Sequence, residues 1–136
     1  MIKKFIITGD THGQVDTRLD NIARNTEYTP GETAVIILGD AGINFYCNKS
    51  EKKRKHQLSK YDIHIYCVRG NHEERPENLG YIEHWYDENV KGYVMYEPDY
   101  PNIKYFEDGN AYEICNSRNM PVSVLYNSDY YYGYQV

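Results

Sequence analysis

Three short apolar runs, each followed by a loop of metal-ligand residue types, constrain this chain more than any other feature. The runs are Phe5–Thr8, Ala34–Leu38 and Ile63–Val68. The first two are almost continuous in Ile, Val, Leu and Phe, which is typical of parallel strands buried on both faces. Helical patterns at Val15–Arg24 and Ser50–Lys60 separate the runs, and the first residue of the second pattern is a suitable N-cap. This alternation predicts an α/β fold with right-handed crossovers and helices covering a mainly parallel sheet.

The second half of the chain has a different sequence pattern, in which short apolar segments are separated by turns rich in Pro, Asp, Gly and Asn. The strands expected there are Gly92–Tyr96, Ile103–Phe106 and Ala111–Ile114. We interpret Tyr81–Tyr86 as an aromatic surface segment or a short helix. Residues 116–136 form an atypical tail in which Val122–Tyr126 has the composition of a strand. No linker or repeat divides the chain, so residues 1–136 are expected to form a single domain.

Composition narrows the classes of function. The formal net charge is -5, which argues against a nucleic-acid-binding surface because such surfaces need excess Lys and Arg. We interpret the basic run Lys49–His56 as the solvated face of a helix. The three cysteines are scattered, which fits a reducing compartment, and Cys67 should pack as a small hydrophobe. No segment approaches membrane-spanning length, so the expected location is cytoplasmic.

The loops after the three apolar runs carry residues of one chemistry. They contain Asp10 and His12, then Asp40, then Asn71 and His72. The carboxyl ends of parallel strands lie side by side, and ligands bind there. These five side chains are therefore expected to converge although they are far apart in the sequence.

The convergence predicts a centre with two divalent cations. Two cations about 3.5–4 Å apart need a shared anionic ligand, and Asp40 on the middle loop is the natural bridge. Asp10 and His12 offer a mixed oxygen and nitrogen set that suits Mn, Fe or Zn, with Mn the first choice. Asn71 offers a neutral oxygen to the other metal, and His72 is placed to protonate a leaving group.

The motifs GDTHGQ, GDAGIN and RGNHE, within residues 1–75, resemble those of the calcineurin-like metallophosphoesterase superfamily. They are especially similar to the branch of Ser/Thr protein phosphatases and diadenosine tetraphosphate hydrolases. The resemblance implies a four-layer α/β/β/α sandwich, of which this chain holds the first half: a mainly parallel inner sheet and a partial second sheet. It also implies hydrolysis of phosphate mono- or diesters by a metal-bound hydroxide, with the same five residues in the roles given above.

The second motif departs from the phosphatase pattern, which carries an Arg that grips the substrate phosphate. In GDAGIN the last residue, Asn44, offers hydrogen bonds but no charge. Arg69 and Arg75 in the third loop are candidates to replace the missing charge. These three residues are the predicted substrate contacts.

The larger departure concerns histidines, because the family takes further histidine ligands from its second sheet. The chain has five histidines and none follows His84, which is either a late ligand or part of an aromatic patch with Trp85 and Tyr86. We therefore expect a C-terminally incomplete domain whose second metal site is weak or empty. An uncovered sheet face would favour a homo-oligomer.

Two functions remain open on this basis. The first is a metal-dependent phosphoesterase acting on a phosphorylated small molecule or a phosphoprotein. The alternative is a non-catalytic metallophosphoesterase remnant that serves as a binding module, suggested by the missing histidines and the aromatic residues Tyr81, Trp85 and Tyr86. Nucleic acid and membrane are not expected partners.

Overall fold

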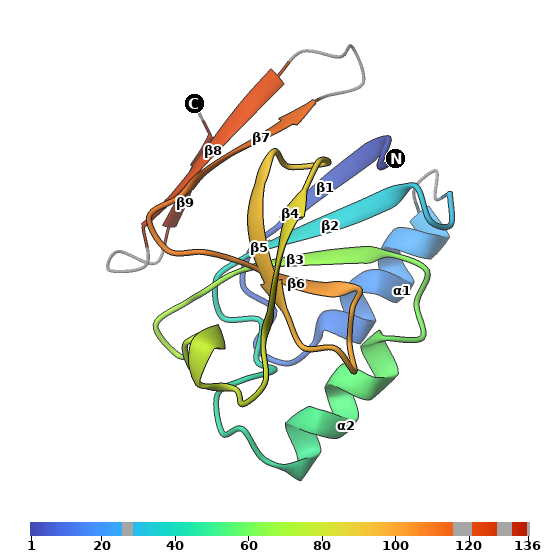
Figure 1. Ribbon diagram of the computed structural model, residues 1–136. Coiled ribbons are helices and arrows are strands. Elements are labelled where there is room, and N and C mark those ends of the chain that lie inside the picture. The colour runs from blue at the N-terminus through green and yellow to red at the C-terminus, as the bar shows by residue number, and fades with distance from the viewer. Residues whose placement is uncertain (26–28, 116–120, 128–131, 136) are drawn as a thin grey trace.

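The computed structural model describes residues 1–25, 29–115, 121–127 and 132–135, which form an α/β fold with two sheets (Figure 1). The elements in chain order are β1 (Lys4–Thr8), α1 (Val15–Asn25), β2 (Thr33–Leu38), α2 (Lys49–Leu58), β3 (His64–Val68), a 3-10 turn (Pro76–Asn78), β4 (Glu83–Asp87), β5 (Gly92–Tyr96), β6 (Ile103–Phe106), β7 (Ala111–Cys115), β8 (Pro121–Asn127) and β9 (Tyr132–Gln135). Neither helix in these ranges has the length and apolarity that crossing a bilayer requires.

The six-stranded main sheet has the order β1-β2-β3-β6-β5-β4. Strands β1, β2, β3 and β6 run parallel, whereas β5 and β4 complete the sheet in antiparallel pairings. Thr8 pairs with Ile37, and Leu38 pairs with Val68, so the carboxyl ends of the first three strands lie side by side. The predicted parallel α/β sheet is confirmed, and the three loops leave it side by side.

Both helices cover one face of this sheet (Figure 1). Alternate residues of β2, Val35 and Ile37, point into a core shared with Leu19 of α1 and Leu58 of α2. All four side chains are at most 1% exposed. Burying an aliphatic side chain of this size contributes about 1.5–3 kcal/mol, so this core anchors the sheet from which the loops emerge.

The opposite face carries a second apolar core. Ala34 and Ile36 of β2 lie there with Tyr66 of β3, together with Tyr112 and Ile114 of β7. Strand β7 belongs to a three-stranded antiparallel sheet of order β7-β8-β9, the expected partial second sheet. The strand expected at 122–126 lies within β8.

The segment Tyr81–Tyr86 was predicted to be an aromatic surface segment or a short helix. Its aromatic side chains are exposed, as the first alternative predicts, whereas the short helix is wrong. Residues Glu83–Asp87 form strand β4 because they pair along their length with β5, with Tyr86 opposite Tyr93. Cross-strand pairs of aromatic residues stabilise the pairing of two strands. The ring centroids of Tyr86 and Tyr93 lie 5.3 Å apart in a T-shaped arrangement.

Two local predictions also need correction. Strand β1 lies at the sheet edge, so Ile7 is 45% exposed rather than buried. Helix α2 begins at Lys49, and its N-cap is Asn48 instead of Ser50, because the Asn48 side chain accepts a hydrogen bond from the Glu51 N–H.

Candidate metal centre and adjoining cavity

Backbone hydrogen bonds join the first two loops at the carboxyl ends of β1 and β2. The N–H of His12 donates to the Asp40 carbonyl at 2.9 Å, and the N–H of Gly13 donates to the Ala41 carbonyl at 2.7 Å. The Thr11 hydroxyl donates to the same Ala41 carbonyl at 2.9 Å. The first loop is therefore placed by the second, and the side chains of His12 and Asp40 are brought to one point.

Two glycines permit this close approach. Gly42 has φ +79° and lies so near Gly13 that a Cβ would collide with the Gly13 backbone. A Cβ on Gly70 would collide with the Asp40 carboxylate and backbone. Any side chain at these two positions would push the loops apart, so the glycines of the second and third motifs are needed for packing.

The ligand atoms of Asp10, His12 and Asp40 lie within 4.8 Å of one another. The His12 Nε2 atom is 3.4 Å from Asp10 Oδ2. His12 and Asp40 have φ values of +43° and +31°, a strained region for residues with a side chain that is concentrated at functional sites. Two carboxylates and an imidazole at this spacing fit a divalent cation such as Mn, Fe or Zn.

The third loop is tied to the same carboxylate. Asp40 is 5% exposed, and its Oδ1 accepts a hydrogen bond from the backbone N–H of His72 at 2.9 Å. Asn71 is exposed and lies between Gly70 and His72, both of which contact Asp40. Thus the structure brings together Asp10, His12 and Asp40, and it holds the Asn71–His72 backbone beside them.

A cavity of about 460 Å³ opens next to this group. Its lining includes His12, Asp40 and His72 from the three loops, and Ser50 and Arg54 from α2. The volume is typical of small-molecule sites. The candidate metal ligands His12 and Asp40 therefore line a space that can hold a substrate.

Arg54 is a cavity residue that the sequence interpretation missed. Its Nη1 donates to the Gly42 carbonyl at 2.6 Å, and its guanidinium packs over Gly13, next to His12. The basic run Lys49–His56 was predicted to be the solvated face of a helix, and most of its residues are exposed on α2. The prediction fails for Glu51 and Lys55, which are buried, and for Arg54, which is half-buried. The spacing of Ser50 and Arg54, one helical turn apart, was the available signal.

The partly buried carboxylate of Glu73 holds the second loop from the side of the third loop. It accepts hydrogen bonds from the N–H groups of Gly42 at 2.5 Å and Asn44 at 3.0 Å. Burial raises the pKa of Glu73, and the two backbone donors oppose that rise. This side chain links motif three to motif two.

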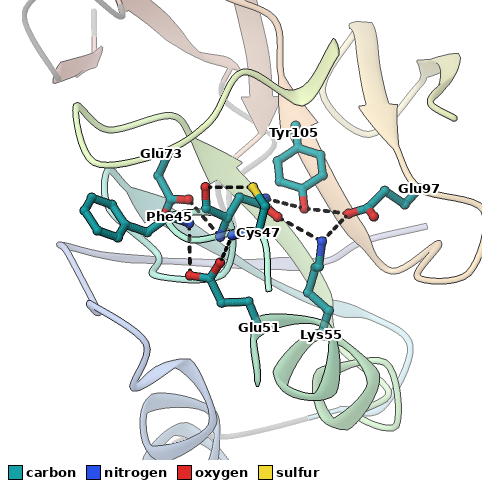
Figure 2. Close-up of polar contacts among 8 residues, drawn as sticks. Phe45, Cys47, Glu51, Lys55, Glu73, Glu97 and Tyr105 are labelled. Carbon is teal, nitrogen blue, oxygen red and sulfur yellow. Dashed lines mark hydrogen bonds and ion pairs between the residues drawn. The ribbon is translucent and has the colours of Figure 1, made fainter. Parts of the chain in front are cut away.

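The carboxylate of Glu51 holds the outer part of the same loop (Figure 2). Its two oxygens accept hydrogen bonds from Phe45 N–H at 2.9 Å and Cys47 N–H at 2.5 Å. Glu51 is 3% exposed, so it acts from inside the protein. Bonds to a charged acceptor stabilise by about 1.5–3 kcal/mol, which explains a buried acid on α2.

A polar network lies deeper under this loop (Figure 2). The Lys55 Nζ donates to Asn44 Oδ1 at 2.9 Å and to Glu97 Oε1 at 2.8 Å. The Asn44 Nδ2 donates to the Tyr105 hydroxyl at 2.9 Å. Asn44 is 2% exposed, so the predicted substrate contact is placed in a buried structural network.

The other two predicted substrate residues meet on one acid. Arg69 and Arg75 lie 3.0 Å and 3.2 Å from Asp108 Oδ2. The described cavity lining includes Arg54 but neither of these arginines. Their positive charges are therefore directed to Asp108 in this structure.

The remaining histidines lie elsewhere in the described ranges. His64 is in β3, where its Nε2 is 3.3 Å from the Gly31 carbonyl. His84 on β4 is 3.1 Å from Glu107 Oε1, and His56 is exposed on α2. The one group of three or more metal-ligating His, Cys, Asp or Glu residues in the described part of the chain is Asp10, His12 and Asp40.

Comparison with known protein families gives a match over nearly the whole chain. The family model for calcineurin-like phosphoesterases matches residues 3–135, beyond the 75 residues on which the sequence resemblance rests. A comparison with curated proteins and one with solved structures gave no significant match.

Proposed function

Because this chain belongs to the calcineurin-like phosphoesterase family, we propose that it is a metal-dependent hydrolase of phosphate mono- or diesters. The observation that carries the proposal is the convergence of Asp10, His12 and Asp40, whose ligand atoms lie within 4.8 Å of one another. Two members of this group, His12 and Asp40, line a cavity large enough for a phosphorylated small molecule.

We propose that Asp10, His12 and Asp40 hold one divalent cation and that Asp40 and Asn71 hold a second. Mn suits this set of carboxylate, imidazole and amide ligands. When bound, such ions act as Lewis acids toward the phosphoryl oxygens and lower the pKa of water. Asp40 has the central position required of a shared ligand, since loops one and three both bond to it.

His72 is proposed as the general acid. Its backbone is fixed by the hydrogen bond to Asp40, and its side chain lines the cavity. The imidazole ring lies 5.6 Å from the ring of Phe45, on the cavity wall. From this position it would donate a proton to the departing oxygen of the ester.

Hydrolysis of p-nitrophenyl phosphate and bis(p-nitrophenyl) phosphate with added Mn²⁺ tests the proposal. The Asp40→Asn variant should lose more than about 100-fold in rate, because even outer-shell partners of a metal are worth 10–100-fold. Asp99→Asn, an exposed acid in the loop before β6, is the matched control and should retain the rate. Activity that survives Asp40→Asn would refute the metal-centre assignment.

The role of His72 has its own signature. A general acid matters most when the leaving group is poor. His72→Asn should therefore slow hydrolysis of phenyl phosphate far more than hydrolysis of p-nitrophenyl phosphate. An equal loss on both substrates would remove His72 from this role.

A second candidate function rests on exposed aromatic residues at the sheet edge. Tyr81, Trp85 and Tyr86 are 72%, 44% and 41% exposed, and the last two lie on edge strand β4. Such a surface favours a family member that binds a partner without turnover. The absence of metal-dependent hydrolysis in the assays above would favour this function.

A further inference from the structure

Side chains of two chemical kinds line the cavity. His12, Asp40 and His72 belong to the loops of the candidate metal centre, and the aromatic rings of Phe45 and Tyr46 lie in the same lining. These aromatic side chains are 47% and 73% exposed, although each carries a large apolar ring. Apolar rings left open beside a polar site favour a ligand that covers them.

The rings are arranged as a continuous wall. The Phe45 ring lies 4.5 Å from the Tyr46 ring at an interplanar angle of 89°. On its other side it lies 5.6 Å from the His72 ring at 33°. The wall therefore extends from the third-loop histidine outward, so a group attached to a phosphoryl at the metal centre would meet it.

The loop that carries the wall is held in place from below. The Glu51 carboxylate bonds the N–H of Phe45 and that of Cys47, on both sides of Tyr46. Cys47 has a φ of +52°, a conformation that costs free energy and that these bonds help to hold. A fixed backbone lowers the entropy lost when a ring packs on the aromatic side chains.

Arg54 supplies the charge that a phosphoryl group requires. It lies in the cavity lining between the loop of Gly42 and the backbone next to His12. A guanidinium has five N–H donors, and the 2.6 Å bond to the Gly42 carbonyl orients the group. Its planar fork suits phosphate oxygens better than a lysine would.

We propose that the cavity selects small phosphoesters whose leaving group carries a planar ring, such as a nucleoside or an aryl group. Arg54 contacts the phosphoryl oxygens, and Phe45 and Tyr46 stack on the ring. This inference rests on the proposed phosphoesterase function, and it names the substrate class of that same site. Stacking of one base on an aromatic side chain is worth enough to discriminate by about tenfold or more.

Equilibrium binding of phosphonates, which are not hydrolysed, tests the ring preference separately from turnover. The probes are phenylphosphonate, methylphosphonate and the phosphonate analogue of AMP, titrated into the Mn²⁺-loaded protein by calorimetry. The two ring-bearing probes should bind at least about tenfold more tightly than methylphosphonate. Equal affinities for all three would overturn the proposal. The stronger of the two ring probes distinguishes a nucleoside from an aryl substrate.

Substitutions test which cavity residues contact the ring of the ligand and which contact its phosphoryl group. Tyr46→Ala should weaken the ring-bearing probes about tenfold and leave methylphosphonate unchanged. Tyr81→Ala is the matched control because Tyr81 is 72% exposed, against 73% for Tyr46, and it should change neither. A loss of the same size for methylphosphonate would show that Tyr46→Ala disturbs the site as a whole, and this would overturn the assigned role.

Arg54→Gln should weaken all three phosphonates about tenfold, and Arg54→Lys should recover part of this loss. The control is Arg24→Gln, an exposed arginine in the last turn of α1. Unchanged phosphonate binding in Arg54→Gln would remove Arg54 from the site.

Adenosine, which has a ring and no phosphate, separates failure of the inference from failure of the proposed function. It should bind metal-free wild type and Arg54→Gln equally, and Tyr46→Ala should bind it more weakly. Adenosine binding without any metal-dependent hydrolysis would support the ring site while refuting the enzyme. Hydrolysis without ring selectivity would refute the inference alone. A phosphotyrosine peptide that binds more tightly than phenylphosphonate would overturn the assignment to small molecules.

Discussion

Helices α1 and α2 lie against the same face of the sheet, yet one buries aliphatic side chains and the other buries charged ones. Helix α1 presents Val15 and Leu19 to the core, at 1% and 0% exposure. On α2 the buried residues are Glu51, Lys55 and Leu58, spaced by four and three residues on one side of the helix. Only the last of these is apolar.

The difference follows from what each helix packs against. Helix α1 contributes to the apolar core over β2. The first turns of α2 instead contact the loop that follows β2, whose backbone N–H groups need acceptors inside the protein. Buried charge on α2 therefore shapes the cavity and its aromatic wall, whereas the apolar side of α1 serves the fold.

The largest effect should come from Lys55→Met. In the ion pair of Lys55 and Glu97, the two side chains are 5% and 15% exposed, respectively. Removing the Lys55 ammonium leaves the Glu97 carboxylate without its buried partner. Breaking a buried pair costs about 3–5 kcal/mol, measured as the free energy of unfolding in urea. Lys52→Met, an exposed residue on the same helix, should cost nearly nothing. Equal effects of the two variants would break the contrast between the helices.

Leu19→Ala should lower the free energy of unfolding by about 2–5 kcal/mol, because it leaves a cavity in the core. The folded protein should bind ring-bearing phosphonates as the wild type does, since α1 shapes no part of the described cavity lining. Denaturant titration and calorimetry together measure both quantities. Weakened phosphonate binding at unchanged stability would show that α1 also shapes the cavity.

Glu51→Gln should lower the free energy of unfolding by about 1–3 kcal/mol, because the charged acceptor of two backbone N–H groups is lost. Unlike Leu19→Ala, it should also weaken binding of phenylphosphonate, since the backbone around Tyr46 is released. Hydrogen exchange of the Phe45 and Cys47 amides should accelerate. Full protection of these amides in the variant would contradict the role given to the Glu51 carboxylate in holding this loop.

The smallest effect concerns a partly buried polar pair outside α2, His64 and Lys104, whose Nδ1 and Nζ atoms are 3.0 Å apart. Burial lowers the pKa of His64, and the nearby Lys104 ammonium lowers it further. The folded state therefore disfavours the protonated imidazole, so stability is lost as the pH falls below the unfolded value of 6.5. Unfolding free energies of wild type and His64→Gln, compared between pH 5 and 8, should differ less at the acid end. A pH-independent difference would contradict this assignment.

Local patterns predicted the parallel strands and the meeting of Asp10, His12 and Asp40, because apolar runs and strand-end loops report directly on sheet order. Strand β4 was missed although it forms a hairpin with the next strand, β5, because its aromatic-rich segment shows no clear alternation of apolar and polar residues. The burial of Asn44 and the place of Arg54 in the cavity lining depend on which face of α2 packs against the protein. A run of charged residues does not encode that face by hydrophobicity.

Metal content tests the central claim most directly. After loading with Mn²⁺ and removal of excess ion, elemental analysis of the wild type should find at least one Mn per chain. Asp40→Asn should lose it while remaining folded, and Asp99→Asn should retain it. A wild type that holds no metal, or an Asp40→Asn variant with the same Mn content as the wild type, would contradict the assignment of this loop cluster as a metal centre.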